Sequence, residues 1–80
     1  MNLFKSVVKA AARAINDANS NRKRDNVKSL TYRQTGKQLK QAQKSGQFVN
    51  GSTLYRINLE KNKRRIEQSH SNLEKFIDSL

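Results

Sequence analysis

The sequence has no cysteine, few acidic residues and no long apolar run, and each shortage excludes a class of protein. Without cysteine, neither a disulfide framework nor a cysteine-ligated zinc cluster can stabilise the chain. The most apolar stretch, residues 3–15, is interrupted by Lys5, Lys9 and Arg13. It is too short and too charged to cross a membrane or to act as a secretion signal. We therefore expect a cytoplasmic protein that is soluble and not secreted.

The apolar residues that build cores are also scarce. Leu, Ile, Val and Phe together make up 18 of the 80 residues, which is close to the level of roughly 20% below which charged chains stay disordered. A chain of this length buries only about 60% of its unfolded surface. We expect one small domain over residues 1–80 that gains stability, or part of its folding, from a partner.

Positive charge is the most abundant feature of the chain. It has 17 Lys and Arg against 6 Asp and Glu, a net charge of +11, and residues 1–65 contain 16 of the cations but only three of the acids. So dense a positive charge repels itself in a compact monomer and favours a polyanionic partner. Nucleic acid is the first expectation, and an anionic membrane or an acidic protein follows.

The spacing of apolar residues predicts a mainly α-helical fold. An amphipathic helix is expected over residues 1–20, where the apolar residues recur at helical spacing and are expected to pack in the core; binding to a membrane surface is the weaker alternative. These residues are Leu3, Phe4, Val7, Val8, Ala11, Ala14, Ile15 and Ala18. A basic loop is predicted at 21–26, followed by short helices at roughly 26–34 and 37–45 with a turn at Thr35–Gly36, because glycine disfavours a helix interior.

The segment SGQFVNGSTLYRI, residues 45–57, has two interpretations. Gly46 suits the left-handed position that ends a helix. Asn50–Gly51 then favours a two-residue β-hairpin, giving a wing over 47–57 with Phe48 on its inner face and Arg56 pointing outward. In the alternative, Ser52 caps a helix that continues to the C-terminus. The predicted fold is therefore a bundle of three or four helices, with the wing as an option.

Residues 58–80 are predicted to form a C-terminal helix with an apolar seam. Leu59, Ile66, Leu73 and Leu80 lie seven residues apart, as in a coiled coil. We expect this seam to pack against the first helix, with a homodimer or larger assembly through 59–80 as the less favoured use. A capping box at Ser71 predicts a break there. The lone His70 has no cysteine or carboxylate cluster near it in sequence, so we predict no metal, no cofactor and no catalytic site.

Residues 39–48 (LKQAQKSGQF) and 50–57 (NGSTLYRI) together resemble the excisionase and MerR-type winged helix-turn-helix family. The resemblance implies that the basic helix enters the major groove of DNA, where Lys37, Lys40, Gln41 and Lys44 would read the sequence. It also implies that Arg56 lies on the wing. Apart from the resemblance, lysines suit phosphate contact and glutamines suit hydrogen bonds to adenine, although a Lys/Gln helix surface is often simply solvated.

Two further basic clusters are Arg22-Lys23-Arg24 and residues 61–65 (KNKRR). They suit phosphate contact, since each neutralised phosphate releases counterions, although they could equally be solvated surface. The predicted function is non-enzymatic binding of nucleic acid, duplex DNA before RNA, by a small regulator or accessory factor of a phage or mobile element. The alternative is a structural or inhibitory protein, such as a virion component, that docks on a larger assembly. The candidate nucleic-acid-binding residues are Arg22, Lys23, Arg24, Lys37, Lys40, Gln41, Lys44, Arg56, Lys61, Arg64 and Arg65.

Overall fold

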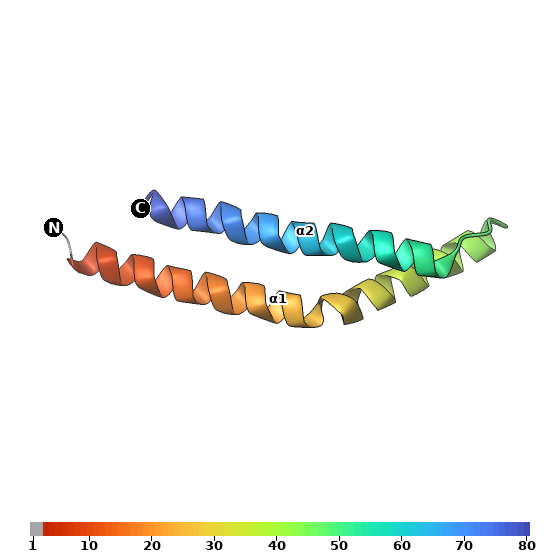
Figure 1. Ribbon diagram of the computed structural model, residues 1–80, viewed down its shortest axis with the longest axis horizontal. Helices are drawn as coiled ribbons and strands as arrows, with labels where there is room; N and C mark the ends of the chain where they lie inside the picture. Colours follow the sequence, from red (N-terminus) through yellow and green to blue (C-terminus); the bar gives the residue numbers. More distant parts are fainter. Residues whose placement is uncertain (1–2) are drawn as a thin grey trace.

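Two long antiparallel helices make up the protein. The computed structural model describes residues 3–80, with α1 at Leu3–Lys44 and α2 at Gly51–Asp78. The helices lie side by side as a rod of 64 × 19 × 17 Å, and the start of α1 and the end of α2 lie at the same end of it (Figure 1). We call this the open end, and the other the turn end. The protein is therefore an α-helical hairpin.

The prediction of three or four helices with a wing is wrong. Residues 3–80 contain no strand, and the predicted loop at 21–26 and turn at Thr35–Gly36 both lie inside α1. The polar residues 21–26 are compatible with a helix. The Asn21 side chain there accepts a hydrogen bond from Arg24, one turn later, at 2.8 Å. Gly36 is tolerated because packing of α1 against α2 outweighs a propensity cost of about 1 kcal/mol.

The connection between the helices confirms one predicted detail and corrects the rest. Gly46 has the expected left-handed conformation, with φ of 72°. The amides of Gly46 and Gln47 donate to the carbonyls of Gln43 and Ala42, which is a Schellman motif. Asn50 is the N-cap of α2, and its side chain accepts a hydrogen bond from the Thr53 amide. The asparagine thus starts a helix rather than a hairpin, and the cap lies two residues before the predicted Ser52.

The interface between the helices is mostly polar. Val27 and Ile77 are its buried large apolar residues, whereas six buried residues are polar: Asn16, Ser20, Thr31, Thr35, Asn58 and Asn62. No buried side-chain nitrogen or oxygen within residues 3–80 lacks a partner. Hydrogen bonding rather than a large apolar core therefore holds the helices in register.

Two matching hydrogen-bonded triads, four residues apart on each helix, account for this polar interface. The amide nitrogen of Asn62 donates to Thr31 Oγ1 at 2.9 Å and to Gln34 Oε1 at 3.0 Å. The amide nitrogen of Asn58 donates likewise to Thr35 Oγ1 and Gln38 Oε1. Thr31 also donates to the Val27 carbonyl one turn earlier. Such bonds often bend helices, and α1 changes direction near its middle in Figure 1.

The apolar side of residues 1–20 does not pack in a core, contrary to expectation. Leu3 is 76%, Phe4 74% and Val7 66% exposed. The side of α1 that faces α2 instead presents Asn16 and Ser20. The hydrophobic period thus identified the helix correctly but not its packing side, because the interhelix contacts of this chain are polar.

The C-terminal helix packs along α1 as expected, but its buried residues are Asn58, Asn62 and Ile77 rather than those of the predicted seam. It begins earlier than expected, at Gly51, and runs without a break through Ser71. A capping box needs a helix start, and here the backbone amides near Ser71 are already bonded within α2. Two residues of that seam, Leu73 and Leu80, remain 47% and 39% exposed.

Candidate nucleic-acid interface

Folding as a hairpin separates charge along the rod. Residues 22–65, which form the half nearer the turn, contain 13 of the 17 Lys and Arg but only two of the six acids. The open end, residues 3–21 and 66–80, contains the other four cations and four acids. The whole net charge of +11 therefore belongs to one half, which we call the basic half.

A groove between the helices gathers cations from both of them. Arg22, Lys23 and Arg33 line it from α1, and Arg65 lines it from α2. Leu30, also lining this groove, is 51% exposed and offers apolar contact. Among the residues that the structure describes, no acid lines the groove. It is a suitable place for an anion such as a phosphate group.

The other predicted cations lie outside this groove. Lys37, Lys40 and Lys44 are exposed on the C-terminal part of α1, and Arg56, Lys61 and Arg64 are exposed on α2. These six cations form no ion pair within residues 3–80. Their charges are available to a partner.

Arg24 has a structural role within the hairpin. Its guanidinium donates to both carboxylate oxygens of Glu67 on α2, at 2.7 and 2.8 Å. This hydrogen bonding raises the pKa of Arg24 and lowers that of Glu67 below its ordinary value of 4.5. Of the cluster Arg22-Lys23-Arg24, only the first two residues line the groove.

Two glutamines on the C-terminal part of α1 are engaged within the hairpin. Gln34 and Gln38 accept hydrogen bonds from Asn62 and Asn58 across the interface, so their side chains help hold the hairpin together. Gln41 remains exposed beside the turn. Because Gln34 and Gln38 are engaged whereas the lysines remain exposed, this surface suits contact with phosphates more than reading of bases.

Arg33 is the groove residue that sequence analysis missed. It follows Arg22 by eleven residues, which is about three turns of a helix, so the two lie on the same side of α1. This signal was present in the sequence. It was hidden because residues 21–26 were predicted to be a loop, which would have separated the two arginines.

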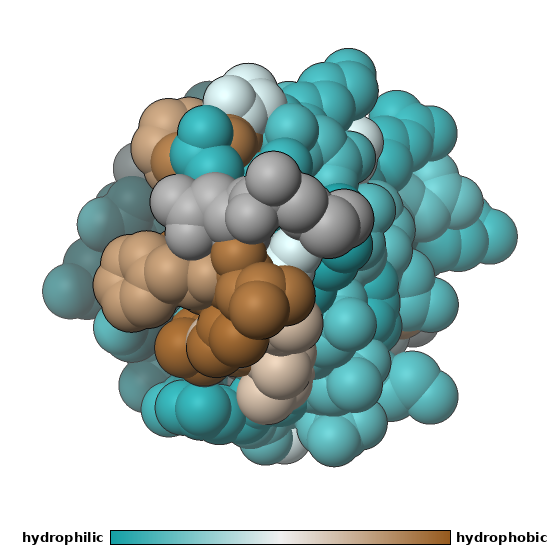
Figure 2. Space-filling model, turned by 90° about the vertical axis from the view of Figure 1, so that its left-hand side faces the viewer, coloured by the Kyte–Doolittle hydropathy of each residue, from teal (hydrophilic) through white to brown (hydrophobic). Residues whose placement is uncertain are grey.

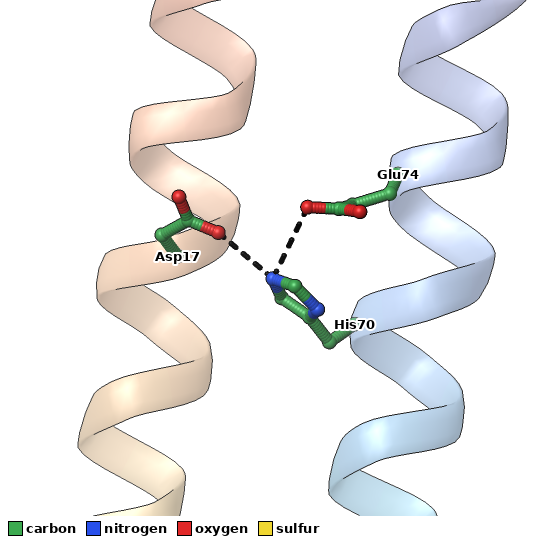
Figure 3. A group of neighbouring side chains, drawn as sticks. All are labelled: Asp17, His70 and Glu74. Atoms are coloured by element: carbon green, nitrogen blue, oxygen red, sulfur yellow. Dashed lines mark hydrogen bonds and ion pairs between the residues drawn. The ribbon is translucent and has the colours of Figure 1, made fainter.

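A second cluster, at the open end, was also missed. Figure 3 shows Asp17 of α1 beside His70 and Glu74 of α2. His70 Nε2 lies 2.8 Å from Asp17 Oδ1 and 3.6 Å from Glu74 Oε1. The side chain of Asn16 donates to the His70 carbonyl at 3.1 Å. The interpretation of His70 as a residue without nearby carboxylates is wrong, because one of its partners is 53 residues away in sequence.

Apolar side chains gather at the open end. Figure 2 looks at this end and shows hydrophobic side chains on one side of it, next to a hydrophilic surface. Leu3, Phe4, Val7, Phe76 and Leu80 are all exposed there. We call these five residues the apolar patch. Exposed patches of this kind mark interaction surfaces in many proteins.

Neither α1 nor α2 contains a stretch apolar enough to cross a membrane, over the residues described. Comparison with protein-family models, with curated proteins and with solved structures finds no match to this chain, so the resemblance of residues 37–57 to the winged helix-turn-helix family gains no support from a relative.

Proposed function

We propose that the protein binds nucleic acid without catalysis, through the phosphate contacts of its basic half. The observation that carries the proposal is the confinement of the full net charge of +11 to residues 22–65, with cations of both helices around one groove. Phosphates neutralised by these cations would release condensed counterions, which is the main source of affinity in sequence-independent binding.

Duplex DNA is the favoured form of nucleic acid, with RNA second. The hairpin is 17–19 Å across, which is wider than the major groove of about 12 Å. The two helices therefore cannot enter the major groove of DNA together. The basic half would instead lie along the phosphate backbone of the DNA. Such a mode suits a small accessory factor of a phage or mobile element that acts in the cytoplasm or in a virion.

The proposal is tested by measuring affinity for duplex DNA, single-stranded DNA, structured RNA and anionic vesicles over a salt series. For duplex DNA we expect the logarithm of the binding constant to fall linearly with that of the salt concentration. The triple variant Arg22→Gln/Arg33→Gln/Arg65→Gln should reduce this slope by about 2 to 3, since each lost phosphate contact removes about 0.9.

The matched control is Lys5→Gln/Lys9→Gln/Lys75→Gln, which removes three cations from the open end and lowers the net charge equally. Its slope should change by less than about one unit. Equal losses in the two triple variants would show that only total charge matters, and would contradict a defined interface. Absence of binding to any nucleic acid at about 0.15 M salt would overturn the proposal.

The apolar patch favours a second candidate function, that of a structural protein assembled from copies of this chain. Two observations support a second copy as its partner. The open end has equal numbers of cations and acids, so two copies meeting there would not repel each other. The basic halves, which do repel, would then point in opposite directions. The two candidate functions are compatible, because they use different ends of the rod.

A further inference from the structure

We infer that Asp17, His70 and Glu74 bind one divalent transition-metal ion, of which Zn²⁺ is the best match, between α1 and α2. This site is separate from the basic half and does not depend on the proposed function. The three side chains come from both helices and converge on one point (Figure 3). Each offers one ligand atom, and these atoms all lie within 4.8 Å of one another.

The distances suit a metal ion with little rearrangement. Zinc binds histidine nitrogen and carboxylate oxygen at about 2.0–2.2 Å, so neighbouring ligands of a tetrahedral ion lie roughly 3.3–3.6 Å apart. His70 Nε2 and Glu74 Oε1 are already 3.6 Å apart, whereas His70 Nε2 and Asp17 Oδ1 are at 2.8 Å. A small rotation of the exposed Asp17 side chain would widen the shorter distance. Water would complete the coordination.

The spacing within α2 also favours coordination of one metal ion by two of its side chains. His70 and Glu74 are four residues apart, which places them on one side of the helix. Both carboxylates approach the same ring nitrogen, Nε2, rather than one on each nitrogen. In the metal-free chain this nitrogen carries a proton when it donates to Asp17, and a metal ion would take the place of that proton.

The chemistry of the donors selects the class of metal. One imidazole with two carboxylates suits Zn²⁺ and neighbouring transition-metal ions, whereas Ca²⁺ and Mg²⁺ prefer oxygen donors alone and more of them. The imidazole is partly shielded, since the His70 side chain is 19% exposed. The backbone at His70 is tied to α1, because Asn16 donates to its carbonyl.

Nearby cations do not occupy the two carboxylates. Arg13 lies close enough to Glu74 to interact with it but is hydrogen-bonded to Asp78, and Arg24 is hydrogen-bonded to Glu67. With a neutral imidazole, the three ligands have a charge of −2, which favours a divalent cation. Arg13 interacts with Glu74 and Arg24 with Asp17, so both arginines oppose the binding of a cation.

A metal ion here would join the helices where few apolar contacts do. Ile77 is the buried large apolar residue of the open end in the described chain. Because the ligands come together only in the folded hairpin, metal binding would stabilise that state. The chain contains a single histidine and no cysteine, so no second imidazole and no thiolate competes for the ion.

The test is titration of the full-length chain with ZnCl₂, followed by calorimetry and by the melting temperature from circular dichroism. We expect one ion per chain and a higher melting temperature that falls again on adding EDTA. His70→Gln should abolish binding, and Asp17→Asn and Glu74→Gln should each weaken it at least tenfold. Co²⁺ should give the visible absorption of a coordinated ion in the wild type but not in His70→Gln.

The control variant Glu60→Gln removes a carboxylate from α2 outside the cluster and should bind as the wild type does. If only His70→Gln reduces binding, the metal is held by an isolated histidine and the site is overturned. One ion per two chains, measured alongside the mass in solution, would overturn it as well. Should His70→Gln fail to fold, the two carboxylate variants decide, because both residues are exposed.

Discussion

Single polar residues determine how the two helices of this chain pair. Asn58 and Asn62 each donate twice across the interface, and both are buried. Replacing such a network with apolar residues can leave stability unchanged, but a polar group that needs a specific partner penalises a shifted register. The triads are therefore best understood as fixing the register of α1 against α2.

Asn62→Ala should lower the free energy of unfolding by about 1–3 kcal/mol, because the buried Thr31 hydroxyl and the Gln34 carbonyl lose their donor. Urea unfolding followed by circular dichroism measures this change. Asn72→Ala is the control, since Asn72 is exposed on the same helix; it should change stability by less than about 0.5 kcal/mol. Equal stability of the two variants would show that the triad adds nothing.

The ion pair of Arg24 and Glu67 predicts a pH effect. Since the folded pKa of Glu67 is below its ordinary value of 4.5, the pair stabilises the hairpin above about pH 4.5, and this contribution is lost as the pH falls through the folded pKa. Arg24→Gln should raise the pKa of Glu67 toward 4.5, as measured by NMR of its carboxyl carbon. Arg56→Gln should leave that pKa unchanged, and an equal rise in both variants would contradict the pairing.

At the scale of elements, the sequence predicts a mainly helical chain, but not the number of helices or their uninterrupted length. The end of α1 at Gly46 was predictable, because a left-handed glycine is a local signal. The continuity of α1 through residues 21–26 and Gly36 was not, since it depends on α2 packing along it. The start of α2 was ambiguous, because Asn50–Gly51 suits a type I′ turn as well as a helix cap.

One candidate site was likewise predictable from the sequence and the other was not. The basic clusters were visible in sequence, and most of their members are exposed. The cluster of Asp17, His70 and Glu74 was not visible in sequence, because it joins residues from opposite ends of the chain. The apolar side of the first helix was predicted correctly, but the prediction that it packs in a core was wrong. The hydrophobic period shows which residues share one side of a helix, not whether that side is buried.

At the scale of the whole molecule, the apolar patch predicts association. Val7→Glu should weaken self-association of the chain at least tenfold, measured by sedimentation equilibrium, because it places a charge among exposed apolar residues. Tyr32→Glu is the matched control. Tyr32 is also on α1 and 75% exposed, but it lies in the basic half and receives the same charge change. If the wild-type chain is monomeric at all concentrations, the second candidate function is wrong.

The separation of charge has a consequence for orientation. A rod 64 Å long with its net charge in one half has a centre of charge displaced from its centre of mass. In the field of a polyanion such a rod experiences a torque that turns its charged end inward before contact. Chains bound along the backbone by their basic halves would leave their open ends away from the nucleic acid. A coated strand would then present an outer layer of apolar ends, and two coated strands would adhere.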